Sequence, residues 1–156
     1  MEEKIYEVYW SGPYSLNKAK NLKPKKANKF VLYKIYQTHP LYGPDSLVYI
    51  GKTERGGDTR INEHSDWLDY DKYGKPKIYF ASIGEFTDWE STPDKHFEPI
   101  DSSIIGDVEA LLIYAHQPAY NTMNKKTAGR SRGIRVFNTG EYGALQDEVS
   151  ALFHWI

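Results

Sequence analysis

Glu109 is the residue that most strongly suggests chemistry, because it interrupts an apolar pattern. It lies four residues from Ile105 and from Ile113, so a helix would place all three on one face. A carboxylate buried there needs a cation, hydrogen-bond donors or a raised pKa to offset its desolvation. A metal ion and a structural ion pair with lysine or arginine both meet that need, and the ion pair is the commoner arrangement.

Arg60 and His64 form a second candidate group. A spacing of four places them on the same face of a predicted helix. A guanidinium can bind phosphate oxygens in bidentate fashion, and a neutral imidazole can accept or relay a proton. The same spacing is also typical of a solvated helix face, so the pair indicates chemistry only in combination with other residues.

Tyr33 and Tyr49 each lie in the middle of a predicted strand. Buried strand tyrosines usually pack in the core with a hydrogen-bonded hydroxyl. A catalytic role requires both of them to lie close to Glu109 and Arg60. Sequence spacing alone cannot show this, because it depends on the tertiary fold.

The elements that must position these residues follow from residue type and turn chemistry. Segments rich in β-branched and aromatic residues predict strands at 5–10, 30–37, 47–51 and 77–83. The second and third most simply form a hairpin, because the loop 38–46 contains strong turn residues. Helices are expected at 58–68, from Asp101 to before Pro118, and at 141–156. This order predicts an α+β domain in which helices flank a small antiparallel sheet of about three strands.

The composition is that of one globular domain without disulfides. The chain has 156 residues, enough to bury a core, and no cysteine, which also excludes thiolate metal sites. The longest apolar run, residues 110–115, is too short for a membrane span, and the first ten residues do not resemble a secretion signal. We therefore expect a cytoplasmic protein that does not bind membranes.

Charge is unevenly distributed, although the formal net charge is only −1. Residues 8–44 and 110–140 contain no Asp or Glu, and most acidic residues lie between 54 and 107. Such segregation can create a positive face that a polyanion recognises. Solvated surface lysines are the alternative interpretation. The candidate DNA-binding residues in these stretches are Lys23, Lys25, Lys26, Arg130, Arg132 and Arg135.

Five short segments together resemble one enzyme family. They are VLYKI at 31–35, VYIGK at 48–52, RINEH at 60–64, DVEA at 107–110 and QPAYN at 117–121. In this order they are similar to the motifs of the GIY-YIG nucleases: two paired strand motifs, an arginine, a metal-binding glutamate on a helix, and an asparagine after a proline. Five matches in the correct order are specific, although each alone is weak. The resemblance covers roughly residues 29–124.

Two features depart from the family pattern. Val31 stands where the first motif would have glycine, and the segments 38–46 and 84–101 look like insertions. Neither departure removes a residue that matches the family's catalytic set.

The resemblance implies hydrolysis of DNA phosphodiester bonds with one divalent metal ion, Mg²⁺ or Mn²⁺, per active site. Glu109 would bind the metal ion, whose other ligands would be mostly water. Arg60 would supply a second positive charge to the non-bridging phosphate oxygens.

The resemblance also implies roles for the remaining residues. Tyr33 would be the general base, with His64 able to accept its proton and Tyr49 as the alternative base or a water-positioning group. A free tyrosine has a pKa of about 10, and Lys52 is the nearby cation in sequence that could lower it. Asn121 would orient the glutamate or a backbone segment rather than react.

We expect a single nuclease domain over residues 1–156, with a core at 29–124 and extensions at 1–28 and 125–156. The lack of room for a second DNA-binding domain favours a compact, site-specific, restriction-like endonuclease that cuts double-stranded DNA as a homodimer. The alternatives are a repair or mobile-element nuclease, and a non-catalytic DNA-binding or structural module that retains the nuclease fold.

Overall fold

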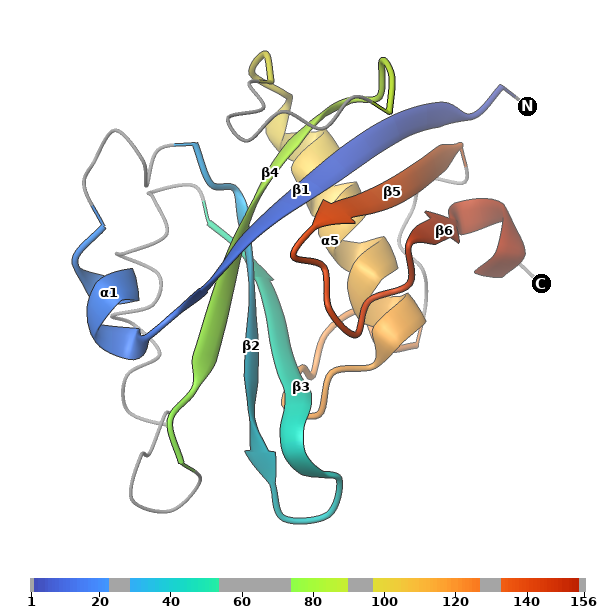
Figure 1. The fold of residues 1–156 in the computed structure, drawn as a ribbon. Coiled ribbons are helices and arrows are strands. Elements are labelled where there is room, and N and C mark those ends of the chain that lie inside the picture. Colours follow the sequence, from blue (N-terminus) through green and yellow to red (C-terminus); the bar gives the residue numbers. More distant parts are fainter. Residues whose placement is uncertain (1, 23–28, 54–73, 90–96, 127–132, 155–156) are drawn as a thin grey trace.

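The computed structural model describes residues 2–22, 29–53, 74–89, 97–126 and 133–154. These residues form one six-stranded sheet with the strand order β3-β2-β4-β1-β5-β6 (Figure 1). The strands are β1 Lys4–Tyr14, β2 Leu32–His39, β3 Gly43–Lys52, β4 Lys77–Glu85, β5 Ile134–Gly140 and β6 Glu148–Ser150. β1 and β5 pair in parallel, and the other neighbours pair antiparallel.

The hairpin expected from the sequence is confirmed. β2 and β3 pair antiparallel, and the chain leaves the turn between them through left-handed backbone at Gly43 and Asp45, the first and third residues of β3, with φ angles of 90° and 53°. Left-handed backbone is favourable for glycine and is tolerated by aspartate. β4, also expected, pairs with β2 on its other side, so β2 is an internal strand of the sheet.

Helix α5, Ser102–His116, confirms the second predicted helix. Its apolar stripe buries Val108, Leu111 and Leu112 completely, and it ends at Gln117, whose backbone is left-handed, directly before Pro118. α5 contacts both edge strands of the sheet, β3 and β6. The sheet therefore curls around this helix, and the main core fills the space between them (Figure 1).

A second apolar cluster covers the opposite face of β2 and β4. The short helix α1, Leu16–Lys20, contributes Leu16 and Ala19, which pack with Tyr33, Ile35 and Phe80. Because both faces of β2 are covered, the six residues from Leu32 to Gln37 are all buried. This explains why the β2 segment is rich in apolar and aromatic residues rather than alternating with polar ones.

The predicted sheet of about three strands flanked by helices is wrong. The three strands β3, β2 and β4 form only one half of a larger mixed sheet. β1, from the segment expected to be an N-terminal extension, lies between β4 and β5 and joins the two halves. The described residues contain only two α-helices, and strands form most of their regular structure.

The predicted C-terminal helix is also wrong within its described residues. Val149 is buried on β6, where it pairs with Val136 of β5, and a short 3₁₀ helix, η1 Ala151–His154, follows. In such a helix Leu152 would share a buried face with Val149, but it has 44 % of its surface exposed. Left-handed Gly140 and Gly143 place turns where the helix would have begun. The predicted helix at 58–68 lies outside the described residues.

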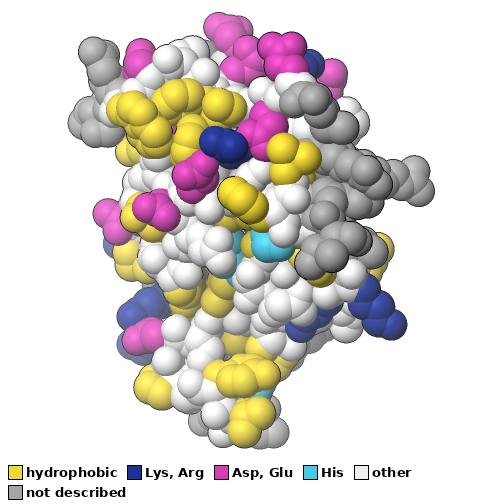
Figure 2. Space-filling model, turned by 90° about the vertical axis from the view of Figure 1, so that its right-hand side faces the viewer, with side chains coloured by type: hydrophobic (Ala, Val, Ile, Leu, Met, Phe, Trp, Pro, Cys, Tyr) yellow, Lys and Arg dark blue, Asp and Glu magenta, His cyan; other side chains and the backbone are white. Residues whose placement is uncertain are grey.

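Figure 2 shows the side of the molecule that carries the β5 and β6 end of the sheet. Acidic side chains gather in the upper half of this face, and most of the basic side chains lie in its lower half, toward the end where the β2–β3 turn is located. Across the described ranges no helix has the length and apolar character needed to cross a membrane.

Candidate active site

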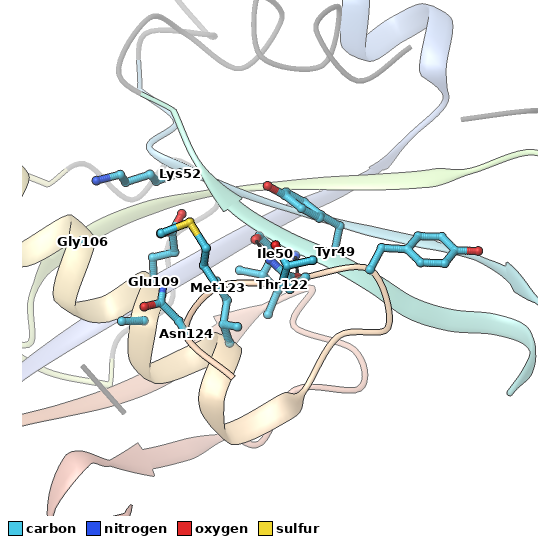
Figure 3. A pocket seen from close by; sticks show the side chains of 12 residues that line it. Tyr49, Ile50, Lys52, Gly106, Glu109, Thr122, Met123 and Asn124 are labelled. Atoms are coloured by element: carbon cyan, nitrogen blue, oxygen red, sulfur yellow. Dashed lines mark hydrogen bonds between the residues drawn. The ribbon is translucent and has the colours of Figure 1, made fainter. Parts of the chain in front are cut away.

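A cavity of about 400 Å³ lies between the edge strand β3, the helix α5 and the segment that follows α5 (Figure 3). Its lining includes Tyr49, Lys52, Glu109 and Asn121. Tyr49 and Lys52 lie on β3, whereas Glu109 and Asn121 come much later in the chain, from α5 and from the segment directly after it. The fold therefore brings these four side chains to one cavity, whereas Tyr33 is not part of its lining.

Asn121 joins the segment after α5 to the edge of the sheet. Its side-chain amide donates to the Ile50 carbonyl oxygen and accepts from the Ile50 backbone N–H, both at 2.9 Å. The Tyr120 backbone N–H adds a bond to the Val48 carbonyl at 2.7 Å. The Asn121 side-chain amide thus pairs with the β3 backbone as a neighbouring strand would. Its role is to hold the segment after α5 against β3, which forms one wall of the cavity.

Lys52 and Glu109 approach the cavity from opposite walls. Glu109 is half-buried on α5 and points toward β3, where Lys52 ends the strand (Figure 3). The Lys52 Nζ lies 3.6 Å from the position that a Cβ on Gly106 would occupy. Gly106 precedes Glu109 by one helical turn, so the ammonium group and the carboxylate occupy the same side of α5. The site therefore combines one carboxylate and one ammonium group at the same cavity.

Tyr33 and Tyr49 stack on each other, with ring centroids 5.8 Å apart and an interplanar angle of 24°. Tyr49 is half-buried and lines the cavity, whereas Tyr33 is fully buried. The Tyr33 ring lies across its cross-strand neighbour Gly51, where an added Cβ would be 2.5 Å from the phenol oxygen. Glycine in the second strand motif is thus required because the ring of the first motif passes over it.

The donor atoms of this cavity fit a hydrated magnesium ion. The described residues contain no group of three or more His, Cys, Asp or Glu side chains that could enclose a metal ion. Mg²⁺ prefers oxygen ligands and keeps several waters when one or two carboxylates bind it. Glu109, with the Thr122 hydroxyl and the Asn124 amide also in the lining, supplies oxygen atoms and room for such waters.

Several candidate residues lie outside the described ranges. Arg60 and His64 are among them, as are Lys23, Lys25, Lys26, Arg130 and Arg132. Arg135 is described, and it lies on β5 rather than at the cavity. Its guanidinium forms ion pairs with Glu3 at 2.8 Å and Glu148 at 3.1 Å, so this group already has two carboxylate partners.

The segment directly after α5 was not recognised from the sequence as part of the site, apart from Asn121. Tyr120, Thr122, Met123 and Asn124 all line the cavity. In the sequence, Pro118 indicates that α5 ends and that the chain changes direction there. It does not indicate that the following segment lies against β3, because that contact is formed only in the tertiary fold.

Comparisons of the chain with family models, with curated proteins and with solved structures found no match.

Proposed function

We propose that this protein is a divalent-metal-dependent endonuclease that hydrolyses phosphodiester bonds of double-stranded DNA. The observation that supports this most is that Tyr49, Lys52, Glu109 and Asn121 line one cavity. Each of them stands at a position that resembles a motif residue of the GIY-YIG nucleases. The proposal concerns the site and not the whole architecture, because one chemistry can be carried by different folds.

Each residue of the cavity has a role in the proposed reaction. Glu109 holds the metal ion, which supplies Lewis-acid stabilisation to the phosphate oxygens when bound. Lys52 adds positive charge where negative charge develops in the transition state. Tyr49, the alternative base of the sequence analysis, is the tyrosine that reaches the cavity, so it orients the attacking water and accepts its proton. Tyr33 stacks behind Tyr49 and fixes its ring.

Arg60 and His64 complete the proposal on the sequence resemblance alone. Arg60 binds the non-bridging oxygens of the phosphate, and His64 accepts the proton of the Tyr49 hydroxyl, so that the phenolate can take the proton of the attacking water. A restriction-like role is our proposal for the biological context.

The decisive experiment compares the wild type with Glu109→Gln. Supercoiled, unmethylated phage or plasmid DNA is incubated with Mg²⁺, and nicked and linear products are quantified. We expect cleavage by the wild type, none with excess chelator, and loss of cleavage in Glu109→Gln with DNA binding retained. Asp107→Asn on the same helix is the matched control and should cleave normally, because Asp107 is not part of the cavity lining.

The outcome distinguishes the alternatives. Cleavage that survives in Glu109→Gln or in excess chelator overturns the metal-dependent mechanism. DNA binding without cleavage by the wild type supports the non-catalytic module instead.

A further inference from the structure

The turn between β2 and β3 exposes two large apolar side chains at one end of the molecule. Leu41 has 78 % of its surface exposed and Tyr42 has 68 %. The turn forms the lower tip of the sheet in Figure 1. Single exposed apolar residues are common on protein surfaces, but two adjacent ones at a projecting tip form a narrow apolar wedge.

His39 holds this turn in a defined conformation. Its Nδ1 accepts hydrogen bonds from the backbone N–H groups of Leu41 and Tyr42, both at 3.1 Å. Its ring also stacks on the Tyr42 ring, with centroids 4.7 Å apart and an interplanar angle of 24°. The wedge is therefore preorganised, and its insertion into a partner would require little ordering of the turn.

The wedge is connected to the cavity by packed aromatic rings. The His39 ring lies 5.5 Å from the ring of Tyr120, and Tyr120 lines the cavity. Tyr42 directly precedes β3, and the seven residue steps from Tyr42 to Tyr49 span roughly 23 Å at the rise of an extended strand. That length corresponds to about seven base pairs of duplex DNA at about 3.4 Å each. A duplex with its phosphate in the cavity would thus come within reach of the wedge.

The surroundings of the turn match a polyanion. The basic side chains visible in Figure 2 lie mostly in the half of the molecule that carries the turn, and the acidic ones gather in the other half. Asp45, an acidic residue within the turn region, is paired with Lys77 at 3.0 Å. A tip of two side chains is also far smaller than the roughly 800 Å² per partner of a stable protein interface, which argues against a second copy of the chain.

We infer that Leu41 and Tyr42 insert between neighbouring base pairs of the bound duplex and kink it near the cleaved phosphate. Apolar side chains that enter a base step unstack it and bend the duplex, which lets more protein surface contact the DNA. The inference rests on the proposed function for the identity of the partner. It goes beyond that function in assigning the contact and the DNA deformation to residues outside the catalytic cavity.

The test uses DNA topology, which needs neither cleavage nor knowledge of the recognition sequence. Glu109→Gln protein is bound to closed circular plasmid in Mg²⁺, a type I topoisomerase relaxes the complex, and the linking number is measured after protein removal. Base-pair unstacking lowers the local twist, so we expect a reduced linking number that grows with occupancy. Adding Leu41→Ala and Tyr42→Ala should abolish most of this change at equal occupancy.

Two matched variants control for bulk and location. Leu41→Met with Tyr42→Phe keeps apolar bulk and should retain the topological change. Phe153→Ala removes a side chain that is 75 % exposed on η1, and it should have no effect. An undiminished change in the Leu41→Ala and Tyr42→Ala variant, or no change with DNA bound, overturns the wedge. Because cleavage is measured separately in the wild type, a failure of the wedge and a failure of the nuclease proposal give different results.

Discussion

The two stacked tyrosines differ in burial and in their position relative to the cavity. Tyr49 lines the cavity, whereas Tyr33 is fully buried against Gly51 and Tyr49. A general base must come within hydrogen-bond distance of the water that it deprotonates. The geometry therefore favours Tyr49 over Tyr33, which the sequence resemblance placed first.

We predict that Tyr49→Phe lowers the cleavage rate by a factor of about 10² or more, because it removes the hydroxyl that general base catalysis requires. Tyr33→Phe should lower the rate less, since it keeps the ring that stacks on Tyr49. Single-turnover cleavage with saturating protein measures both, and thermal unfolding verifies that each variant is folded. The reverse order of damage would assign the base to Tyr33.

At the scale of the elements, two glycines near the cavity differ in whether the structure has room for a side chain at their positions. A Cβ on Gly51 of β3 would lie 2.5 Å from both the terminal ring carbon and the hydroxyl oxygen of Tyr33. A Cβ on Gly106 of α5 would meet only the Lys52 Nζ, at 3.6 Å. The strand glycine is needed for close packing, and the helix glycine is not.

We predict that Gly51→Ala destabilises the fold by about 1–3 kcal/mol, because the buried Tyr33 ring must move. Gly106→Ala should instead stabilise it by up to about 1 kcal/mol, because alanine favours a helix interior over glycine. Urea unfolding of the two variants and the wild type measures the difference. Equal stabilities of Gly51→Ala and the wild type would contradict the packing argument.

The elements that could be predicted are those defined by local sequence. The β2–β3 hairpin and α5 were correct because turn residues, a buried stripe and Pro118 lie within or next to them. The placement of β1 could not be predicted, since its parallel partner β5 lies near the other end of the chain. Leu145 and Val149 are four residues apart, which is a helical spacing. Both are buried, but Leu145 lies in a turn and Val149 lies on β6.

For the candidate site, the sequence singled out residue types but not their arrangement. Glu109 was found because a carboxylate interrupts an apolar stripe, and the structure places it half-buried at the cavity wall. The role of Asn121 as a backbone partner of Ile50 was anticipated only in general terms. Tyr49 lines the cavity because it lies on the edge strand β3, whereas Tyr33 lies on the internal strand β2, and this order of the strands follows from the tertiary fold.

At the scale of the whole molecule, three side chains from β2 and α5 form hydrogen bonds with the backbone of the connection between β5 and β6. The Lys34 Nζ donates to the Tyr142 carbonyl, the Tyr36 hydroxyl accepts from the Ala144 N–H at 3.2 Å, and the His116 Nε2 accepts from the Gln146 N–H at 2.9 Å. Lys34 is fully buried, with its Nζ 4.7–5.1 Å from the ring centroids of Trp10, Tyr36 and Tyr79.

Burial lowers the pKa of Lys34 to about 7, and the negative charge of Glu141 opposes this shift only in part. In the unfolded chain the lysine keeps its ordinary pKa of 10.5. Between these two values the unfolded state binds more protons than the folded state, so the free energy of unfolding increases with pH. Below pH 7 both states are protonated, and this contribution no longer changes.

We therefore predict that the wild type becomes more stable from pH 7 to pH 9. The slope of the free energy of unfolding approaches about 1.4 kcal/mol per pH unit, the maximum for one proton.

The other described groups with shifted pKa values change their protonation outside this pH range. The lowered pKa of His116 acts below its ordinary value of 6.5, and burial raises the pKa of Tyr36 from 10.0 to about 12, which acts above pH 10. Lys34→Met should remove the slope, while Lys75→Met, at an exposed position, should keep it. Urea unfolding at half-unit pH intervals measures all three proteins, and a slope retained in Lys34→Met would show that the buried ammonium does not titrate in this range.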